Sequence, residues 1–221
     1  MQAAFVATRA ADDEYFANVE ASGLLHPLSL LTALYDDEAA ALLIDEPETS
    51  LHPQLQSFLL EEFGKLAGDP SVDTRKKLVI ISTHSPNLLA MRRIEQVSST
   101  IFFRTAWHLP IQVSPDAQEL QSTRLRSLLF QFTESYRAAF FAPRLLLLEG
   151  ASDEVIVSTL AAQLGIPISA GGGQAVPVSG EGSMPHAVKL FRLIGKEPIV
   201  LADLDDLVDT NDLVKTFAVD E

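Results

Sequence analysis

Two short apolar runs that end directly in acidic residues constrain the fold of this chain more than any other feature. Leu42-Leu43-Ile44 leads into Asp45-Glu46, and Leu145–Leu148 leads into Glu149-Gly150. A short apolar run bounded by turn residues is typical of a strand that is buried on both faces of a parallel sheet. Because open α/β sheets bind ligands at the carboxyl ends of their strands, both acidic ends are predicted to lie at ligand-binding edges.

The first acidic pair suits hydrolytic chemistry. Asp45 can hold a metal ion directly or through water, and Glu46 can orient and deprotonate an attacking water. The alternative interpretation is a strand that ends in a solvated acidic turn, because such short motifs also occur by chance. The next predicted strand, 78–81, is followed by His84, for which a hydrogen-bonded turn histidine is the alternative to a binding role.

The C-terminal part predicts a β-α-β-α-β order with strands at 145–148, 175–178 and 199–202. Pro177 suggests that the second strand lies at an edge. The inner faces of the two helices are predicted to be Val155, Ile156, Leu160 and Leu164 in the first, and Ala187, Val188, Phe191 and Ile194 in the second.

Parallel βαβ topology brings the ends of the first and third strands to one edge, where Glu149 can meet Asp203 and Asp205. Bringing three carboxylates together without a counterion costs roughly several kcal/mol of free energy. A bound cation removes this cost, and carboxylate oxygens are hard ligands that favour Mg²⁺ or Mn²⁺. Two such ions would activate a water and stabilise the leaving oxygen in phosphodiester cleavage. A plain acidic turn after a strand is the alternative interpretation of Asp203-Leu204-Asp205-Asp206.

Elsewhere the pattern predicts local structure only. Residues 1–22 are expected to be helical or irregular, and helices are expected at 24–35, with Pro27 in its first turn, and at 53–66. A hairpin is expected at 101–113 and one long helix at 123–141. The cluster of Arg124, Arg126 and Arg137 is interpreted as a solvated helix face.

Composition limits the partners. The 221 residues carry a formal net charge of −14 and no cysteine. Such an acidic chain has no broad basic face, so any contact with DNA is expected to be a local basic patch. No apolar run approaches the ~20 residues of a membrane span, so no membrane partner is expected, and the cytoplasm is the predicted compartment.

Residues 42–53, with their Asp-Glu-Pro-Glu-x-x-Leu-His-Pro form, resemble the Walker B and D-loop segment of ABC/SMC/RecF-like ATPases, in particular the OLD branch (overcoming lysogenisation defect). Ile81–Pro86 resembles the switch-histidine segment of the same family. The resemblance implies an ATP site with Asp45 on Mg²⁺, Glu46 as the base, Ser50 at the nucleotide and His84 at the γ-phosphate. It also implies a homodimer formed around ATP. Ser22-Gly23 is the candidate signature loop, with a turn and N-cap as the alternative.

The strand-Glu-Gly segment, followed about fifty residues later by strand-Asp-x-Asp, resembles the Toprim domain of topoisomerases, primases and OLD-family nucleases. Leu147–Glu154 resembles the OLD version. The resemblance implies that Glu149 acts in catalysis and that Asp153 joins Glu149, Asp203 and Asp205 in metal binding. A helix N-terminal acid that favours the helix dipole is the alternative for Asp153.

The expected fold class is α/β, with a partial ABC/SMC-type ATPase half-domain at 1–113, a helical connector at 114–142 and a partial Toprim domain at 143–221. The sequence contains no Gly-x-x-x-x-Gly-Lys-Ser/Thr phosphate-binding loop. We therefore expect a fragment of an OLD-family ATP-dependent DNA endonuclease that uses Mg²⁺ or Mn²⁺ and has an incomplete ATP site.

Two alternatives are retained. The first is a non-catalytic, ATPase-derived switch or interaction module with a Toprim-like scaffold. The second is a Toprim of the primase or topoisomerase kind. A topoisomerase would need a catalytic tyrosine, and Tyr15, Tyr35 and Tyr136 all lie in stretches expected to be helical.

Overall fold

The computed structural model describes residues 6–9, 13–16, 22–104, 107–178, 182–203 and 212–217. The chain divides into two compact units, Met1–Leu89 (unit 1) and Ala90–Glu221 (unit 2), and each is described here by itself. Within these residues, no helix combines the length and apolar character needed to cross a bilayer.

Unit 1 opens with a hairpin of two antiparallel strands, β1 (Val6–Arg9) and β2 (Asp13–Phe16). The expectation of a helical or irregular start is therefore wrong for these residues. The reason lies in composition, because β-branched and aromatic residues favour extended backbone. Thr8 pairs with Glu14 in the middle of this ladder.

The centre of unit 1 is a parallel pair of strands, β3 (Ala41–Asp45) and β4 (Leu78–Ser82), with the helices α1 (Ser22–Leu34) and α2 (Pro53–Leu66). The bounds of α2 confirm the predicted helix. Proline suits the first helical position because a backbone N–H there would have no partner within the helix.

Helix α1 starts earlier than the sequence predicts. The backbone of Ser22 and Gly23 lies inside the helix, so the interpretation of this pair as a turn before the helix is wrong. Pro27 consequently lies in the second turn and not in the first. The helix tolerates it there because a proline so near the N-terminus removes only one intrahelical hydrogen bond.

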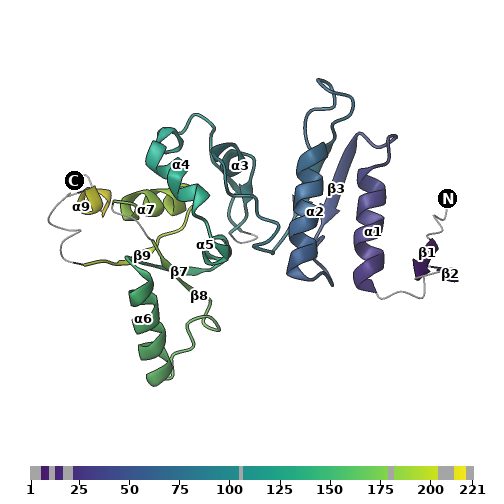
Figure 1. Cartoon of the computed structure of the whole chain (residues 1–221). Coiled ribbons are helices and arrows are strands. Elements are labelled where there is room, and N and C mark those ends of the chain that lie inside the picture. The colour runs from purple at the N-terminus through teal and green to yellow at the C-terminus, as the bar shows by residue number, and fades with distance from the viewer. Residues whose placement is uncertain are drawn as a thin grey trace. The chain divides into compact units, whose positions relative to one another are not determined.

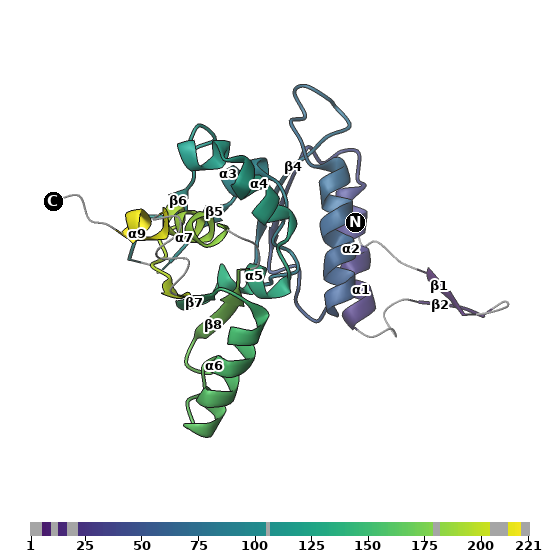
Figure 2. The same cartoon turned by 60° about the vertical axis from the view of Figure 1, so that its left-hand side comes forward.

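One face of the β3–β4 sheet forms the core of unit 1. Leu34, Leu51, Leu59 and Phe63 are buried, and Leu42, Ile44, Val79 and Ile81 of the sheet pack against them. Figures 1 and 2 show α1 and α2 side by side over this face.

The opposite face of this sheet is open. Leu43 is 80% exposed and Ile80 is 50% exposed. The prediction that these strands are buried on both faces is therefore wrong, because both helices lie on the same side. Leu55 and Phe58 of α2 are also exposed.

Unit 2 is built on a three-stranded parallel sheet with the order β8-β7-β9. Its strands are β7 (Arg144–Leu148), β8 (Gly173–Pro177) and β9 (Ile199–Leu201), and Leu148 pairs with Pro177 on one side and with Leu201 on the other. The predicted β-α-β-α-β order is confirmed. Pro177 lies on an edge strand of this sheet, as expected.

The helix expected at 123–141 is two helices, α4 (Thr123–Phe130) and α5 (Glu134–Ala139). Phe132, between them, is buried and stacks on Tyr136 with ring centroids 4.7 Å apart. It also packs against Phe140 at 5.8 Å. Phe132 therefore joins the core of unit 2 although the helix is interrupted there.

Helix α7 (Met184–Leu193) buries the predicted face, which consists of Ala187, Val188, Phe191 and, just after the helix, Ile194. Helix α6 (Ala151–Gln163) does not bury its predicted face, since Val155 is 66% exposed and Leu164 is 71% exposed. Val157 and Ala161, spaced one turn apart, are half-buried and are less exposed than Val155.

The remaining elements of unit 2 are α3 (Ile94–Ser98), the 3-10 helix η2 (Gln118–Gln121), α9 (Asp212–Phe217) and the predicted hairpin of β5 (Ile101–Phe102) and β6 (Ile111–Gln112). Phe102 of the hairpin stacks on Phe140 at 5.8 Å. Residues 90–142 thus belong to unit 2, whereas the boundaries expected from the sequence fall at 113 and 142.

Candidate functional site

The first candidate site is the carboxyl edge of the β3–β4 sheet. Asp45 ends β3 opposite Ser82 of β4, and the N–H of Glu46 donates to the carbonyl oxygen of Ser82 at 2.9 Å. Glu46 has a φ of 44°, in the left-handed region that non-glycine residues rarely adopt. Such a conformation costs roughly 1–2 kcal/mol and often accompanies a functional site.

A carboxylate that the sequence analysis did not single out, Glu48, connects the two acidic segments. It accepts a hydrogen bond from the Thr83 hydroxyl at 2.8 Å and another from the backbone N–H of His84 at 2.7 Å. Glu48 therefore holds the segment after β4 against the turn after β3. Its position inside the Asp-Glu-Pro-Glu motif was the available signal.

The predicted switch histidine faces the predicted base. Nε2 of His84 lies 3.7 Å from Oε1 of Glu46, and both side chains are largely exposed. The contact is an ion pair when the imidazole is protonated. This arrangement leaves both groups open to a ligand at the edge of the sheet.

Hydrogen bonds between buried polar side chains hold the segments of this edge in place. The Ser85 hydroxyl donates to the side-chain carbonyl of Gln56 at 2.5 Å, and the Gln56 amide donates to the Leu51 carbonyl at 2.8 Å. Nε2 of His26 lies 3.2 Å from the Pro47 carbonyl, so α1 also contacts the turn. Ser50 is exposed in this turn, with a φ of 64°.

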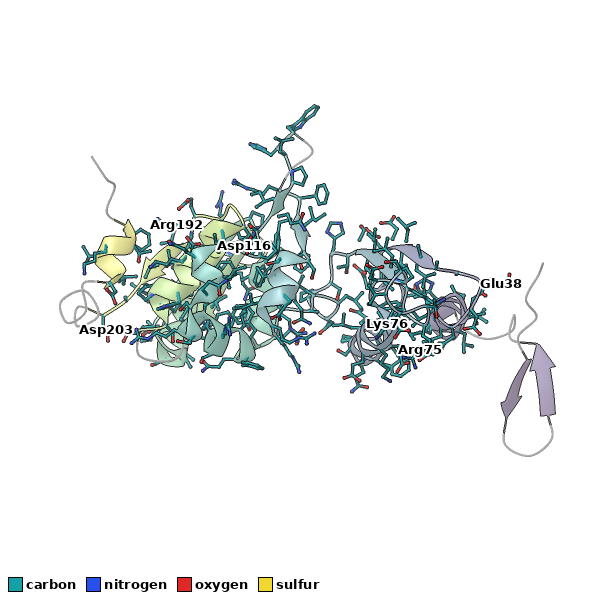
Figure 3. All side chains as sticks on the ribbon, turned by 90° about the horizontal axis from the view of Figure 1, so that it is seen from above. Glu38, Arg75, Lys76, Asp116, Arg192 and Asp203 are labelled. Atoms are coloured by element: carbon teal, nitrogen blue, oxygen red, sulfur yellow. The ribbon has the colours of Figure 1, made fainter. Side chains whose placement is uncertain are left out.

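The second candidate site is the carboxyl edge of the sheet in unit 2. Oε2 of Glu149, directly after β7, accepts a hydrogen bond at 2.7 Å from the backbone N–H of Asp203, which follows β9. Oδ2 of Asp153 accepts from the N–H of Gly150 at 2.9 Å, at the start of α6. Figure 3 labels Asp203 in unit 2.

The structure thus brings Glu149 and Asp203 together. Asp153 is hydrogen-bonded to the backbone of Gly150, the residue that follows Glu149. Asp205 lies outside the described residues. Among the residues that are described, no three metal-binding side chains gather into one group. The hard oxygen donors at this edge nevertheless have the chemistry that Mg²⁺ and Mn²⁺ prefer.

The tyrosines give no support to a topoisomerase-like site. Tyr136 is buried, and its burial raises the pKa of the phenol well above its usual value. The Tyr35 hydroxyl donates to Oε2 of Glu62 at 2.5 Å. The side chain of Tyr15 lies outside the described residues.

Comparison with known proteins agrees with this two-part arrangement. Residues 8–90 match the AAA_21 family, an AAA domain whose description also names an AbiEii toxin of a type IV toxin–antitoxin system. Residues 140–205 match the Toprim domain of proteins like the overcoming lysogenization defect protein.

A curated relative spans both parts. Over 171 residues the chain is 25% identical to endonuclease GajA of Bacillus cereus (strain VD045), and the match covers 77% of this chain and 27% of that protein. The chain therefore contains a segment that matches an AAA domain, followed by a segment that matches an OLD-like Toprim domain.

Proposed function

We propose that this chain takes part in ATP-dependent cleavage of DNA by an OLD-family endonuclease. The supporting observation is the hydrogen bond between Glu149 and Asp203, which joins the acidic ends of two neighbouring parallel strands. The relative that spans both segments carries the name endonuclease.

In this proposal Glu149, Asp153, Asp203 and Asp205 hold Mg²⁺ or Mn²⁺ at the carboxyl edge of unit 2. The bound ion would activate water and stabilise the leaving oxygen of a phosphodiester. The contact with the N–H of Asp203 directs Oε2 of Glu149, and within the described residues Oε1 has no hydrogen-bond partner. Glu149 can therefore be held in place by one oxygen while the other remains open to a ligand.

For the ATPase unit, we propose that Asp45 holds Mg²⁺, Glu46 serves as the base for the attacking water, and His84 contacts the γ-phosphate, with Ser50 at the nucleotide. Glu48 is then a positioning residue, because its two hydrogen bonds fix the segment that carries His84. The open edge around Glu46 suits the approach of a second copy around the nucleotide, so we include a homodimer in the proposal.

Nicking of supercoiled plasmid by the 221-residue chain with Mn²⁺ tests the nuclease site. Glu149→Gln and Asp203→Asn are expected to abolish nicking. The charge-matched control Asp116→Asn, at an exposed position of unit 2, is expected to nick like the parent. Equal nicking by parent and site variants would reject the assignment.

A non-catalytic switch or interaction module is the second candidate, and the open apolar face of the β3–β4 sheet favours it, since Leu43 is 80% exposed and Ile80 is 50% exposed. Calorimetry separates the two. Binding of Mn²⁺ that is lost in Glu149→Gln supports the nuclease, whereas no heat with either Mn²⁺ or Mg-ATP supports the module.

A further inference from the structure

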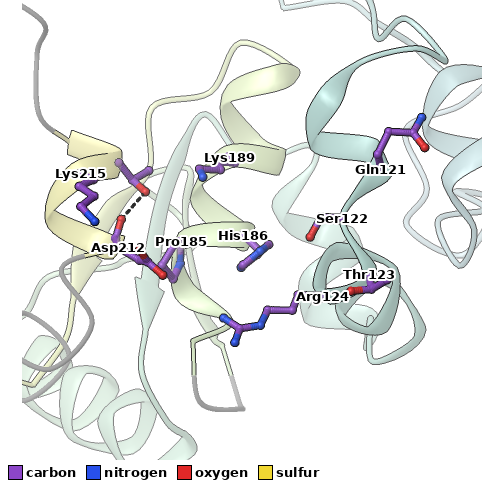
Figure 4. Close-up of a pocket in the computed structure, with 10 residues that line it drawn as sticks. Gln121, Ser122, Thr123, Arg124, Pro185, His186, Lys189, Asp212 and Lys215 are labelled. Atoms are coloured by element: carbon purple, nitrogen blue, oxygen red, sulfur yellow. Dashed lines mark hydrogen bonds between the residues drawn. The ribbon is translucent and has the colours of Figure 1, made fainter.

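A pocket of about 610 Å³ in unit 2 is lined by none of the residues assigned above. The start of α4, the first turns of α7 and helix α9 line it. Figure 4 shows Arg124 reaching from α4 towards α7, where His186 and Lys189 lie, with Lys215 and Asp212 on α9.

The charge of this pocket is opposite to that of the chain. The chain has a formal net charge of −14, yet the lining contains three permanent cations, Arg124, Lys189 and Lys215, and one carboxylate, Asp212. In the described part of the chain, none of these three cations has an ion pair or a hydrogen bond. Other basic side chains do have partners, as Arg192 has in Glu197 and Lys196 has in the Ala142 carbonyl.

Local geometry fixes two of the lining groups. The Gly182 carbonyl can only accept a hydrogen bond, so Nδ1 of His186, 3.1 Å away, carries the proton and Nε2 is left for another partner. Gly182 has a φ of 68°, and a Cβ added to it would lie 3.0 Å from Nη1 of Arg124. A glycine here therefore lets the guanidinium pass close to the backbone before α7.

The pocket adjoins the acidic edge by topology. In a parallel βαβ unit the helix begins on the side where the preceding strand ends. Only residues 178–183 separate β8 from α7, so the first turn of α7 lies at the carboxyl edge that also carries Glu149 and Asp203. The end of the pocket formed by Pro185 and His186 thus belongs to the same edge of the sheet as the proposed metal acids.

We propose that this pocket binds phosphate groups of the DNA backbone next to the phosphodiester that is cut. The guanidinium fork of Arg124 and the two ammonium groups match phosphate oxygens. This inference rests on the proposed function, because it takes the substrate DNA as the ligand.

The test is fluorescence anisotropy of a labelled duplex in EDTA, where cleavage cannot occur, over a series of salt concentrations. The double variant Arg124→Gln/Lys189→Gln is expected to weaken binding about 10-fold or more and to lower the slope of log K against log salt by about two, since each phosphate contact contributes about 0.9. Gly182→Ala, which displaces the guanidinium, is expected to weaken binding less.

Arg144→Gln is the matched control, because Arg144 is exposed at the start of β7, on the opposite edge of the sheet. It is expected to bind like the parent. Unchanged binding by the double variant, or an equal loss in the control, would overturn the proposal. So would displacement of the duplex by ATP or inorganic phosphate beyond the effect of chloride at equal ionic strength, because the pocket would then serve free phosphates.

The outcome is separable from that of the proposed function. If no protein nicks plasmid but the pocket variants still lose DNA affinity, the cleavage assignment fails and the pocket stands. If Glu149→Gln abolishes nicking but the pocket variants bind DNA normally, the cleavage assignment stands and the pocket proposal is rejected.

Discussion

The backbone N–H of Asp203 donates to Oε2 of Glu149 at 2.7 Å, although 54 residues separate the two. The bond joins the turn after β7 to the turn after β9. One carboxylate oxygen is thereby committed to the protein itself. The other oxygen, Oε1, has no hydrogen-bond partner among the described residues. The side chain is therefore oriented before a ligand binds at this edge.

Two replacements of Glu149 should distinguish its contribution to stability from its contribution to metal binding. Glu149→Gln keeps an acceptor for the Asp203 N–H, whereas Glu149→Ala removes it and should lower the free energy of unfolding by about 1 kcal/mol. Both variants should lose affinity for Mn²⁺. Urea unfolding of the two proteins checks this, and equal stability of the Gln and Ala variants would show that the hydrogen bond contributes nothing.

Glu48 offers a second prediction, in unit 1. Glu48→Ala removes the acceptor of both the Thr83 hydroxyl and the His84 N–H, so the unit should lose about 1.5–3 kcal/mol. Hydrogen exchange of the His84 amide should become faster in the variant. The control Glu61→Ala, on the exposed side of α2, should leave that amide unchanged. Unaltered exchange in Glu48→Ala would show that other contacts hold this segment.

The left-handed backbone of Glu46 predicts that glycine is more stable than alanine at this position. At an ordinary position alanine is more stable than glycine, but at a φ of 44° the side chain itself is the strained element. Glu46→Gly should therefore be more stable than Glu46→Ala, by roughly 0.5–1 kcal/mol. Thermal unfolding of the two variants measures this difference. A more stable alanine variant would mean that the turn changes its backbone conformation when Glu46 is replaced.

The contact between Tyr35, directly after α1, and Glu62 of α2 should depend on pH. The Lys65 ammonium and the Tyr35 hydroxyl both bind the Glu62 carboxylate and lower its pKa. Because the pKa is lower in the folded state, the stabilisation is complete above the unfolded value of about 4.3 and disappears as the pH falls through the folded value.

Glu62→Gln should accordingly be less stable than the parent at neutral pH and equal to it in acid. Unfolding curves at a series of pH values check this, with Glu61→Gln as a neighbour that should follow the parent throughout. A gap between Glu62→Gln and the parent that stays constant down to acid pH would contradict the prediction.

The sequence predicts what depends on local pattern. Pro53 starts α2 where expected, the face of α7 around Phe191 is buried, and β7 is a buried strand that ends in an acid. In each case the periodicity of apolar residues and the nearby turn residues carry the information.

The sequence does not show which side of an element finds a partner. Leu43 of β3 and Val155 of α6 are apolar, yet both are exposed, because burial depends on what lies opposite and not on the residue itself. The contacts of Glu48 with the segment at His84 span 36 residues, so no local pattern contains them. Glu46, Glu149 and Asp203 were identifiable because strand ends are visible in the sequence.

The uncovered face of the β3–β4 sheet has a thermodynamic consequence. Leu43, Leu78 and Ile80 are already largely hydrated in the folded protein. Melting therefore exposes less new hydrocarbon surface than it would in a domain with a sheet covered on both sides. The heat-capacity increment of unit 1 should fall below the usual ~12–15 cal/mol/K per residue, which flattens its stability curve and makes it respond weakly to temperature.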